Sequence, residues 1–516
     1  MKMSFLVLVV TFLTAAAVGT TGEKSHQEQA SNMLPVVSAT HAVAAWQQRA
    51  TADMLKGRSA NSAVWTGKDL IVFGGEGMNV SFGDGARYNF ANDRWQVLPR
   101  AGEPSERTSH SGIWTGKEMI IWGGVGGSYG NNINRNDGAR YNPSKNKWRP
   151  VSNENAPTAR FQHTAVWTGK EMLIWGGYTD SHAFYAGCHA NAALNTGGRY
   201  NPRTNVWKDI STEGAPEKRL AHVALWTGKE MIIWGGTNAT KALNNGGLYN
   251  PRTNSWRPMN MDGAPSPRAW LVAVWTGTEM IVWGGSCDNE YFCDGARYNP
   301  YLDKWTPISS VNAPKGRIFA KGLWTGTDMV LWGGVNDEDV TGVGDPNRYL
   351  NTGARYNPIT NTWTPITTEN SPSGRLANTV WTGDGMLIFG GYNNVHLNDT
   401  WFFPISMGGV SKAPFSEAPR ELKIQEVFAK SLSQNTAYEK FRGKVVFAVL
   451  HRPQRTWLAD GGITVNLIVP KKPKWYEQVG EVVEIEARGK IVEILFEEKH
   501  LTIECEPCDI RILAVD

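Results

Sequence analysis

Residues 114–124 read Trp-Thr-Gly-Lys-Glu-Met-Ile-Ile-Trp-Gly-Gly, and features of this stretch recur along the chain. The apolar run Met-Ile-Ile-Trp, bounded by turn residues, is typical of a short buried strand. Trp-Thr-Gly begins at Trp65, Trp114, Trp167, Trp226, Trp275, Trp324 and Trp381. A Gly-Gly pair begins nine residues after each of these, at Gly74, Gly123, Gly176, Gly235, Gly284, Gly333 and Gly390. This regular spacing predicts a repeat architecture.

Further residues recur at fixed spacing within each unit of about 50 residues. An Arg precedes each Trp-Thr-Gly, at Arg58, Arg107, Arg160, Arg219, Arg268, Arg317 and Arg375. A Tyr-Asn pair follows Gly-Gly in six units, and a second Trp stands seven residues after its Tyr, at Trp95, Trp148, Trp207, Trp256, Trp305 and Trp363. Each unit therefore predicts four short antiparallel strands. Because one such sheet cannot cover both of its own faces, we expect an all-β, seven-bladed β-propeller. Residues present in every blade are interpreted as structural.

The two ends of the repeat array predict how the ring closes. In other units the second Trp lies twelve residues before the next repeat Arg, but the seventh unit lacks a Trp at this spacing. Trp46 lies twelve residues before Arg58. Residues 41–48 are therefore predicted to form the outer strand of the last blade, which removes the exposed edges of an open ring.

The Gly-Gly, Tyr and Trp pattern resembles the kelch repeat, which also builds the propeller of galactose oxidase. The resemblance implies a fold more than a function, since kelch propellers serve as adaptors, sugar enzymes and surface receptors. A copper site like that of galactose oxidase requires a Tyr-His pair that the propeller sequence lacks. We therefore expect a binding protein without a cofactor, and whether it is also an enzyme stays open. The alternative is a sugar-acting epimerase or oxidase with its site at the central channel mouth.

Only one segment of the repeat varies in length. From Gly-Gly to Tyr the first six units have 14, 18, 24, 14, 14 and 23 residues. This segment is the predicted loop between strands two and three, which lies at the same end of the blade as the connection from strand four to the next blade. Variable loops on a rigid scaffold are where function concentrates, so this face is predicted to bind a glycan or protein ligand.

Three groups of residues on this face are candidate ligand-binding residues. The longest loop, 178–196, holds His182, Tyr185 and His189, and the acidic loop of unit six holds Asp337 and Asp339. Three histidines stand three residues after a repeat Arg, at His110, His163 and His222. Imidazoles can bind zinc or copper, but Arg-x-x-His also serves as a local hydrogen-bonding element in kelch units. No metal site is predicted.

The N-terminal residues 1–19 have the features of a signal peptide. Lys2 is followed by an apolar run over residues 5–13 and by small residues near a cleavage point. The net charge of +4 is small for 516 residues and argues against a nucleic-acid binder. We expect a secreted or periplasmic monomer with no transmembrane segment after cleavage. Cys287 and Cys293 share one loop, and export permits a disulfide between them.

The predicted domains are a linker at 20–40, the propeller at 41–405, a second linker at 406–419 and a small β domain at 420–516. Predicted strands in the last domain include residues 482–487, 491–496, 501–505 and 510–515. Their pattern resembles the OB-like domains of exported bacterial proteins and fits a small closed barrel. The sequence does not indicate a role for this domain.

Overall fold

The computed structural model describes residues 44–128, 131–180, 192–338, 340 and 345–405, with the backbone alone at 128 and 131. It also describes the backbone of 8–9, 464–465, 482–497 and 500–515. The chain divides into two compact units, Ala39–Val410, and Met1–Ser38 together with Ser411–Asp516.

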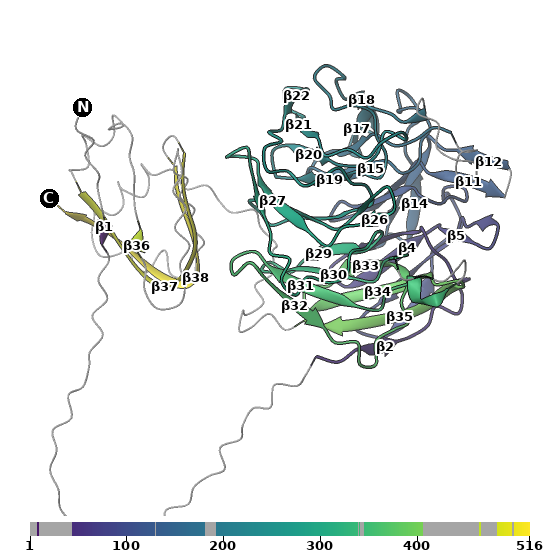
Figure 1. The fold of residues 1–516 in the computed structure, drawn as a ribbon. Helices are drawn as coiled ribbons and strands as arrows, with labels where there is room; N and C mark the ends of the chain where they lie inside the picture. The colour runs from purple at the N-terminus through teal and green to yellow at the C-terminus, as the bar shows by residue number, and fades with distance from the viewer. Residues whose placement is uncertain are drawn as a thin grey trace, which may run out of the picture. The chain divides into compact units, whose positions relative to one another are not determined.

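The first of these units is a ring of seven four-stranded antiparallel sheets, as predicted (Figure 1). Six blades have their strands in chain order from the centre outward, and the seventh takes its outer strand from the N-terminal part of the chain. The innermost strands of neighbouring blades contact one another around the whole ring, and the last blade meets the first. The closed ring buries both faces of every sheet, which a single blade could not do.

The strands have nearly the same bounds in every blade. The innermost strands are β3 (Ser62–Trp65), β9 (Ser111–Trp114), β15 (Thr164–Trp167), β19 (Val223–Trp226), β23 (Val272–Trp275), β29 (Lys321–Trp324) and β33 (Leu376–Trp381). The second strands are β4 (Asp69–Phe73), β10 (Met119–Trp122), β16 (Met172–Trp175), β20 (Met231–Trp234), β24 (Met280–Trp283), β30 (Met329–Trp332) and β34 (Gly385–Tyr392). The third strands are β7 (Gly85–Asn89), β13 (Gly138–Asn142), β17 (Gly197–Asn201), β21 (Gly246–Asn250), β27 (Gly295–Asn299), β31 (Gly353–Asn357) and β35 (His396–Pro404). The outer strands are β8 (Arg94–Val97), β14 (Lys147–Pro150), β18 (Val206–Asp209), β22 (Ser255–Pro258), β28 (Lys304–Pro307), β32 (Thr362–Ile366) and β2 (Gln47–Arg49).

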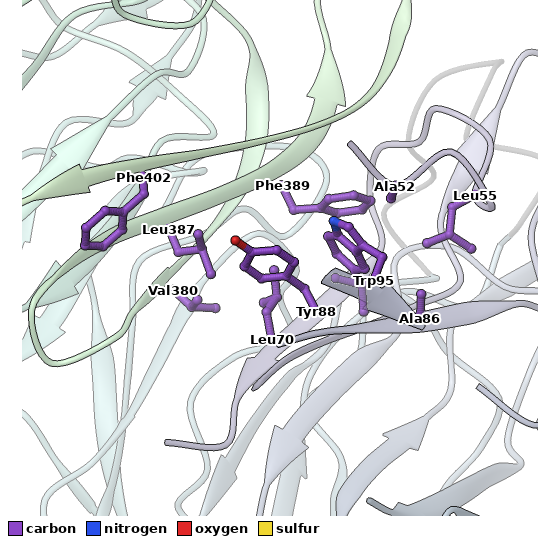
Figure 2. Packing of buried hydrophobic residues seen from close by; sticks show 11 residues of the cluster. Ala52, Leu55, Leu70, Ala86, Tyr88, Trp95, Val380, Leu387, Phe389 and Phe402 are labelled. Atoms are coloured by element: carbon purple, nitrogen blue, oxygen red, sulfur yellow. The ribbon is translucent and has the colours of Figure 1, made fainter. Parts of the chain in front are cut away.

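The N-terminal strand closes the ring, which confirms the prediction. β2 pairs antiparallel with β35, so that Gln48 lies opposite Trp401. The strand is shorter than the predicted segment and begins at Gln47. Figure 2 shows the packing between the seventh and the first blade, where Phe389 packs on Trp95. The centroids of these two rings are 4.8 Å apart.

Aromatic pairs join successive blades, which explains why the repeat retains so many Trp residues. The last residue of a second strand packs on the outer-strand Trp of the next blade, with ring centroids 5.2 to 5.5 Å apart. The pairs are Trp122–Trp207, Trp175–Trp256, Trp234–Trp305 and Trp283–Trp363. Trp332 makes the same contact with Trp46 at 5.3 Å. Trp46 therefore fills the place of the outer-strand Trp that the seventh repeat lacks.

The repeat Arg residues are buried structural elements, as the sequence predicted. Each guanidinium donates to the carbonyl oxygen of the first Gly of its own Gly-Gly pair; Arg160, for example, donates to Gly176 O at 3.0 Å. In four blades a carboxylate also accepts from the Arg, whereas Arg160, Arg219 and Arg317 have Thr or Asn partners. Burial lowers the pKa of Arg317 to about 9. The charge is retained at neutral pH and holds the strand ends together.

The structure describes two strand pairs in the other unit. β1 (Leu8–Val9) pairs with β36 (Thr464–Val465), and β37 (Val482–Glu497) pairs with β38 (His500–Val515). The four short strands predicted here are thus joined into two long ones, with register shifts near Lys490 at the expected break. The OB-like barrel depends on segments outside the described residues and stays a prediction.

Candidate functional site

The loops between strands two and three lie at the same end of the propeller as the connections between blades. In six blades an isolated β-bridge joins the residue after the Gly-Gly pair to the residue after the repeat Arg, as between Glu76 and Ser59. In the seventh blade the equivalent residues, Leu376 and Tyr392, pair within strands. This arrangement confirms the predicted placement of the variable segments. We call this end the loop face, and the opposite end, which carries the Trp-Thr-Gly and Tyr-Asn turns, the turn face.

Several variable loops form structure of their own on the loop face. β5 (Glu76–Gly77) and β6 (Val80–Ser81) of the first blade join β11 (Val125–Ser128) and β12 (Asn131–Asn134) of the second in one small sheet. The fifth blade carries a hairpin of β25 (Ser286–Cys287) and β26 (Glu290–Tyr291), and the sixth carries the 3₁₀ helix η2 (Pro346–Arg348).

The small sheet exposes apolar side chains to solvent. Val80 and Ile133 lie opposite Ser128 and Gly126, respectively, which are two residues apart on β11, so both side chains are on one face of the sheet. Ile133 is 50% exposed, and Met78, in the turn beside Val80, is 83% exposed. Exposed apolar side chains that gather in one place are typical of an interaction surface.

The three candidate histidines bond to the preceding blade. Nε2 of His110 lies 2.9 Å from Ser62 Oγ, and Nε2 of His163 lies 3.0 Å from Ser111 Oγ. His222 makes the same contact with Thr164 at 2.8 Å. The imidazole also packs against the first Gly of the preceding Gly-Gly pair, where a Cβ would come within 2.7 Å of it. These histidines therefore join blades, and the structure favours the hydrogen-bonding alternative over a ligand-binding role.

The histidines are neutral in this setting. Burial, with a smaller contribution from the neighbouring repeat Arg, lowers the pKa of His163 to about 3 and that of His222 well below its usual value. Since the Ser111 hydroxyl donates to Trp122 O, its oxygen is free to accept from His163 Nε2–H. A neutral imidazole that donates from Nε2 satisfies this arrangement.

The acidic and cysteine candidates have different surroundings. Asp337 accepts from the Arg348 guanidinium at 2.8 and 2.9 Å and from the Tyr291 hydroxyl at 3.0 Å, so it joins the loops of the fifth and sixth blades.

Cys287 and Cys293 are free thiols, in contrast to the predicted disulfide. The hairpin register explains the difference, because Cys287 lies opposite Glu290. His182, Tyr185, His189 and Asp339 lie outside the described residues.

A sequence profile described as the KLHDC2/KLHL20/DRC7 kelch-repeat domain matches residues 125–312 and again 248–416. The two matches together span more than half of the chain. The chain belongs to the kelch-repeat family. A search of the curated proteins gives no match. Kelch propellers in general are scaffolds for protein interactions.

A backbone belt runs around the mouth of the kelch propeller on the loop face. The residue two places after the repeat Arg has positive φ in six blades, at Ala60, Ser109, Gln162, Ala221, Trp270 and Phe319. This conformation lets the N–H of one belt residue donate to the carbonyl of the previous one; Trp270 donates to Ala221 and Phe319 donates to Trp270. The belt therefore fixes the backbone at the mouth and leaves its side chains free to differ.

The belt and the strand that follows it carry further candidate residues, which the loop lengths do not indicate. Trp270 and Phe319 are its two aromatic members, and Lys321 follows two residues after Phe319 at the start of β29. The signal was present in the sequence, since Trp270 is a Trp outside the repeat positions. Loop lengths do not reveal it, because the blades differ here in residue type.

Two features are absent from the described part of the kelch chain. No three side chains among its His, Cys, Asp and Glu residues are placed to hold a metal ion. No helix in the same residues has the length and hydropathy needed to cross a membrane.

Proposed function

We propose that this chain is an exported interaction protein whose kelch propeller binds a protein partner through the loop face. The observation that supports this most strongly is the contrast between the two faces. The turn face repeats a Trp-Thr-Gly turn in all seven blades and a Tyr-Asn turn in six. The loop face has segments of different lengths, added strands and a small sheet with exposed apolar side chains. Such variable loops on a rigid scaffold are suited to specific binding.

Export is supported by the N-terminal sequence. A basic residue, an apolar run and small residues precede the propeller in the order of a secretory signal. N-terminal sequencing of the protein from culture medium or periplasm tests this part of the proposal. A mature N-terminus near residue 20 is expected, and recovery of the uncleaved chain only from the cytosolic fraction would contradict export.

Binding is tested with the full mature protein on arrays of extracellular proteins and of glycans. A loop-face variant, Val80→Ser with Ile133→Ser, removes two exposed apolar side chains from the small sheet. A matched control, Leu302→Ser with Ile359→Ser, removes two exposed apolar side chains from turns of the opposite face. We expect protein ligands whose binding weakens at least tenfold in the loop-face variant only. Ligands that depend on the control positions alone would contradict the proposal.

A further inference from the structure

The first residue of β29 lies at a strand position that several other blades fill with a polar side chain. Each of those side chains has a hydrogen-bonding partner in a neighbouring blade. At this register the first three blades have Ser62, Ser111 and Thr164, and each hydroxyl bonds to a histidine of the following blade. The fourth and fifth blades have Val223 and Val272 there, which have no polar group to satisfy. In the seventh blade Asn378 donates to the carbonyl of Asn61. The protein therefore satisfies the polar side chains at this register in every blade but one.

Lys321 is the exception. The following blade has Ala377 where the second to fourth blades have the partner histidine, and among the described residues no hydrogen bond or ion pair engages the Lys321 ammonium. Leu323, two residues on, packs against the seventh blade, so Lys321 is on that same side of β29. The side chain is solvent-exposed, yet it lies deep enough that burial lowers the pKa of its ammonium. The water that reaches it must come from the channel along the axis of the ring.

Two aromatic residues of the belt come just before innermost strands, and one of them precedes the strand that carries this lysine. Phe319 precedes Lys321 by two residues and is 42% exposed, and its ring lies 5.8 Å from that of Trp270, centroid to centroid. Both have positive φ, 54° for Trp270 and 59° for Phe319, a conformation that is unfavourable for bulky residues. The other belt positions hold small or polar residues. The two aromatic side chains are therefore placed at the mouth at a conformational cost, without being buried in a core.

We propose that Lys321, Phe319 and Trp270 form a subsite for an acidic side chain, with an apolar neighbour, on a protruding loop of a protein partner. The proposal rests on the binding role of the loop face and specifies its partner chemistry. A carboxylate would receive a charge-assisted hydrogen bond from an ammonium that has no other described partner. The apolar neighbour would pack on the aromatic pair. Because the ammonium is recessed, a protruding loop reaches it more easily than a flat surface does.

Two displayed libraries of cyclic peptides test the subsite on the full mature protein. They are identical except that the central residue is fixed as Asp or Glu in one and as Asn or Gln in the other. We expect enrichment from the acidic library, with apolar residues beside the fixed position. Affinity of the recovered peptides should fall at least tenfold in Lys321→Gln and in Phe319→Ala. Lys229→Gln, which removes an exposed lysine of the turn face, should leave it unchanged. Melting curves of all variants verify folding.

Other outcomes would overturn the proposal in distinguishable ways. Equal enrichment from both libraries, or no enrichment, would show that the site does not select a carboxylate. Peptides that bind Lys321→Gln normally but fail on the Val80→Ser, Ile133→Ser variant would contradict this subsite and leave the role of the loop face intact. Peptides insensitive to every loop-face change would contradict both. Lys321-dependent binding of a hyaluronan hexasaccharide in place of peptides would show that the partner is an acidic glycan.

Discussion

Nε2 of His163 in the third blade lies 3.0 Å from the hydroxyl oxygen of Ser111 in the second, and the contact joins the two blades beside the channel. The neighbouring pairs, His110 with Ser62 and His222 with Thr164, repeat it. Half of the ring, from the first blade to the fourth, is thus joined by neutral imidazoles. At the same level the fifth and sixth blades pack Leu271 and Ala320 on apolar residues of the preceding blade. Asn378 of the seventh blade donates to the carbonyl of Asn61, and Lys321 stands in this half of the ring.

These histidines predict that the propeller loses stability in acid. An unfolded histidine gains a proton as the pH falls below about 6.5, whereas His163 in the folded state stays neutral down to about 3. The unfolded state therefore binds more protons in this window, and stability decreases as the pH decreases. Each buried histidine should cost about 2 kcal/mol between pH 6.5 and 5.

Urea denaturation of the full chain at both pH values measures this loss. The variant His163→Gln removes one titrating group and keeps an amide that can donate to Ser111, so its stability should depend less steeply on pH. An unchanged slope in His163→Gln would contradict the assignment of a neutral, buried imidazole.

Closure by the N-terminal strand predicts a sharp boundary for N-terminal deletion. Removal of residues 20–40 leaves β2 and Trp46 in place and should not change the melting temperature of the mature protein. Removal of residues 20–49 also deletes the outer strand of the last blade and the contacts of Trp46 with Trp332 and Phe403. This deletion should cause aggregation or a large fall in melting temperature, since it exposes the edge of β35. Two identical melting curves would refute closure by β2.

Substitution of a buried repeat Arg should lower the free energy of unfolding much more than substitution of an exposed Arg. Arg317 is fully buried and donates to the carbonyls of Gly333 and Thr352. Thr352 O also accepts from the Gly333 N–H, so substitution Arg317→Met leaves the buried carbonyl of Gly333 without a described donor. The substitution should cost about 3 kcal/mol or more. The exposed Arg252 on the turn face serves as control, and Arg252→Met should change stability by less than about 0.5 kcal/mol. Chemical denaturation of the two variants makes the comparison, and equal losses would mean that the network at Arg317 is dispensable.

The fold was predictable from the sequence because every repeat has nearly the same strand pattern. Trp46 supplies the outer-strand Trp that the seventh repeat lacks. The candidate site was predictable only in part. The loop face followed from segment lengths. For His163 the sequence left both ligand binding and a local hydrogen bond open, and the structure gives it a partner in another blade, the Ser111 hydroxyl. That partner lies 52 residues away in sequence, and no local pattern indicates it. The unpartnered state of Lys321 could not be predicted locally either, because it depends on Ala377 of the following blade.

The longest loop carries a prediction of its own. Tyr185 and His189, which lie outside the described residues, are expected to contribute ligand contacts. Replacement of both by Ala should abolish binding of a ligand found on the arrays and leave the melting temperature nearly unchanged, because loop tips contribute little to a core. Isothermal titration with that ligand measures the effect. Undiminished binding would remove this loop from the site.

Hydrogen–deuterium exchange of the full mature protein, alone and saturated with the tightest protein ligand from the arrays, tests the central claim most directly. The account predicts that protection on binding concentrates in the segments between strands two and three and in the belt around Trp270 and Phe319. Protection confined to the Trp-Thr-Gly and Tyr-Asn turns of the opposite face would contradict it.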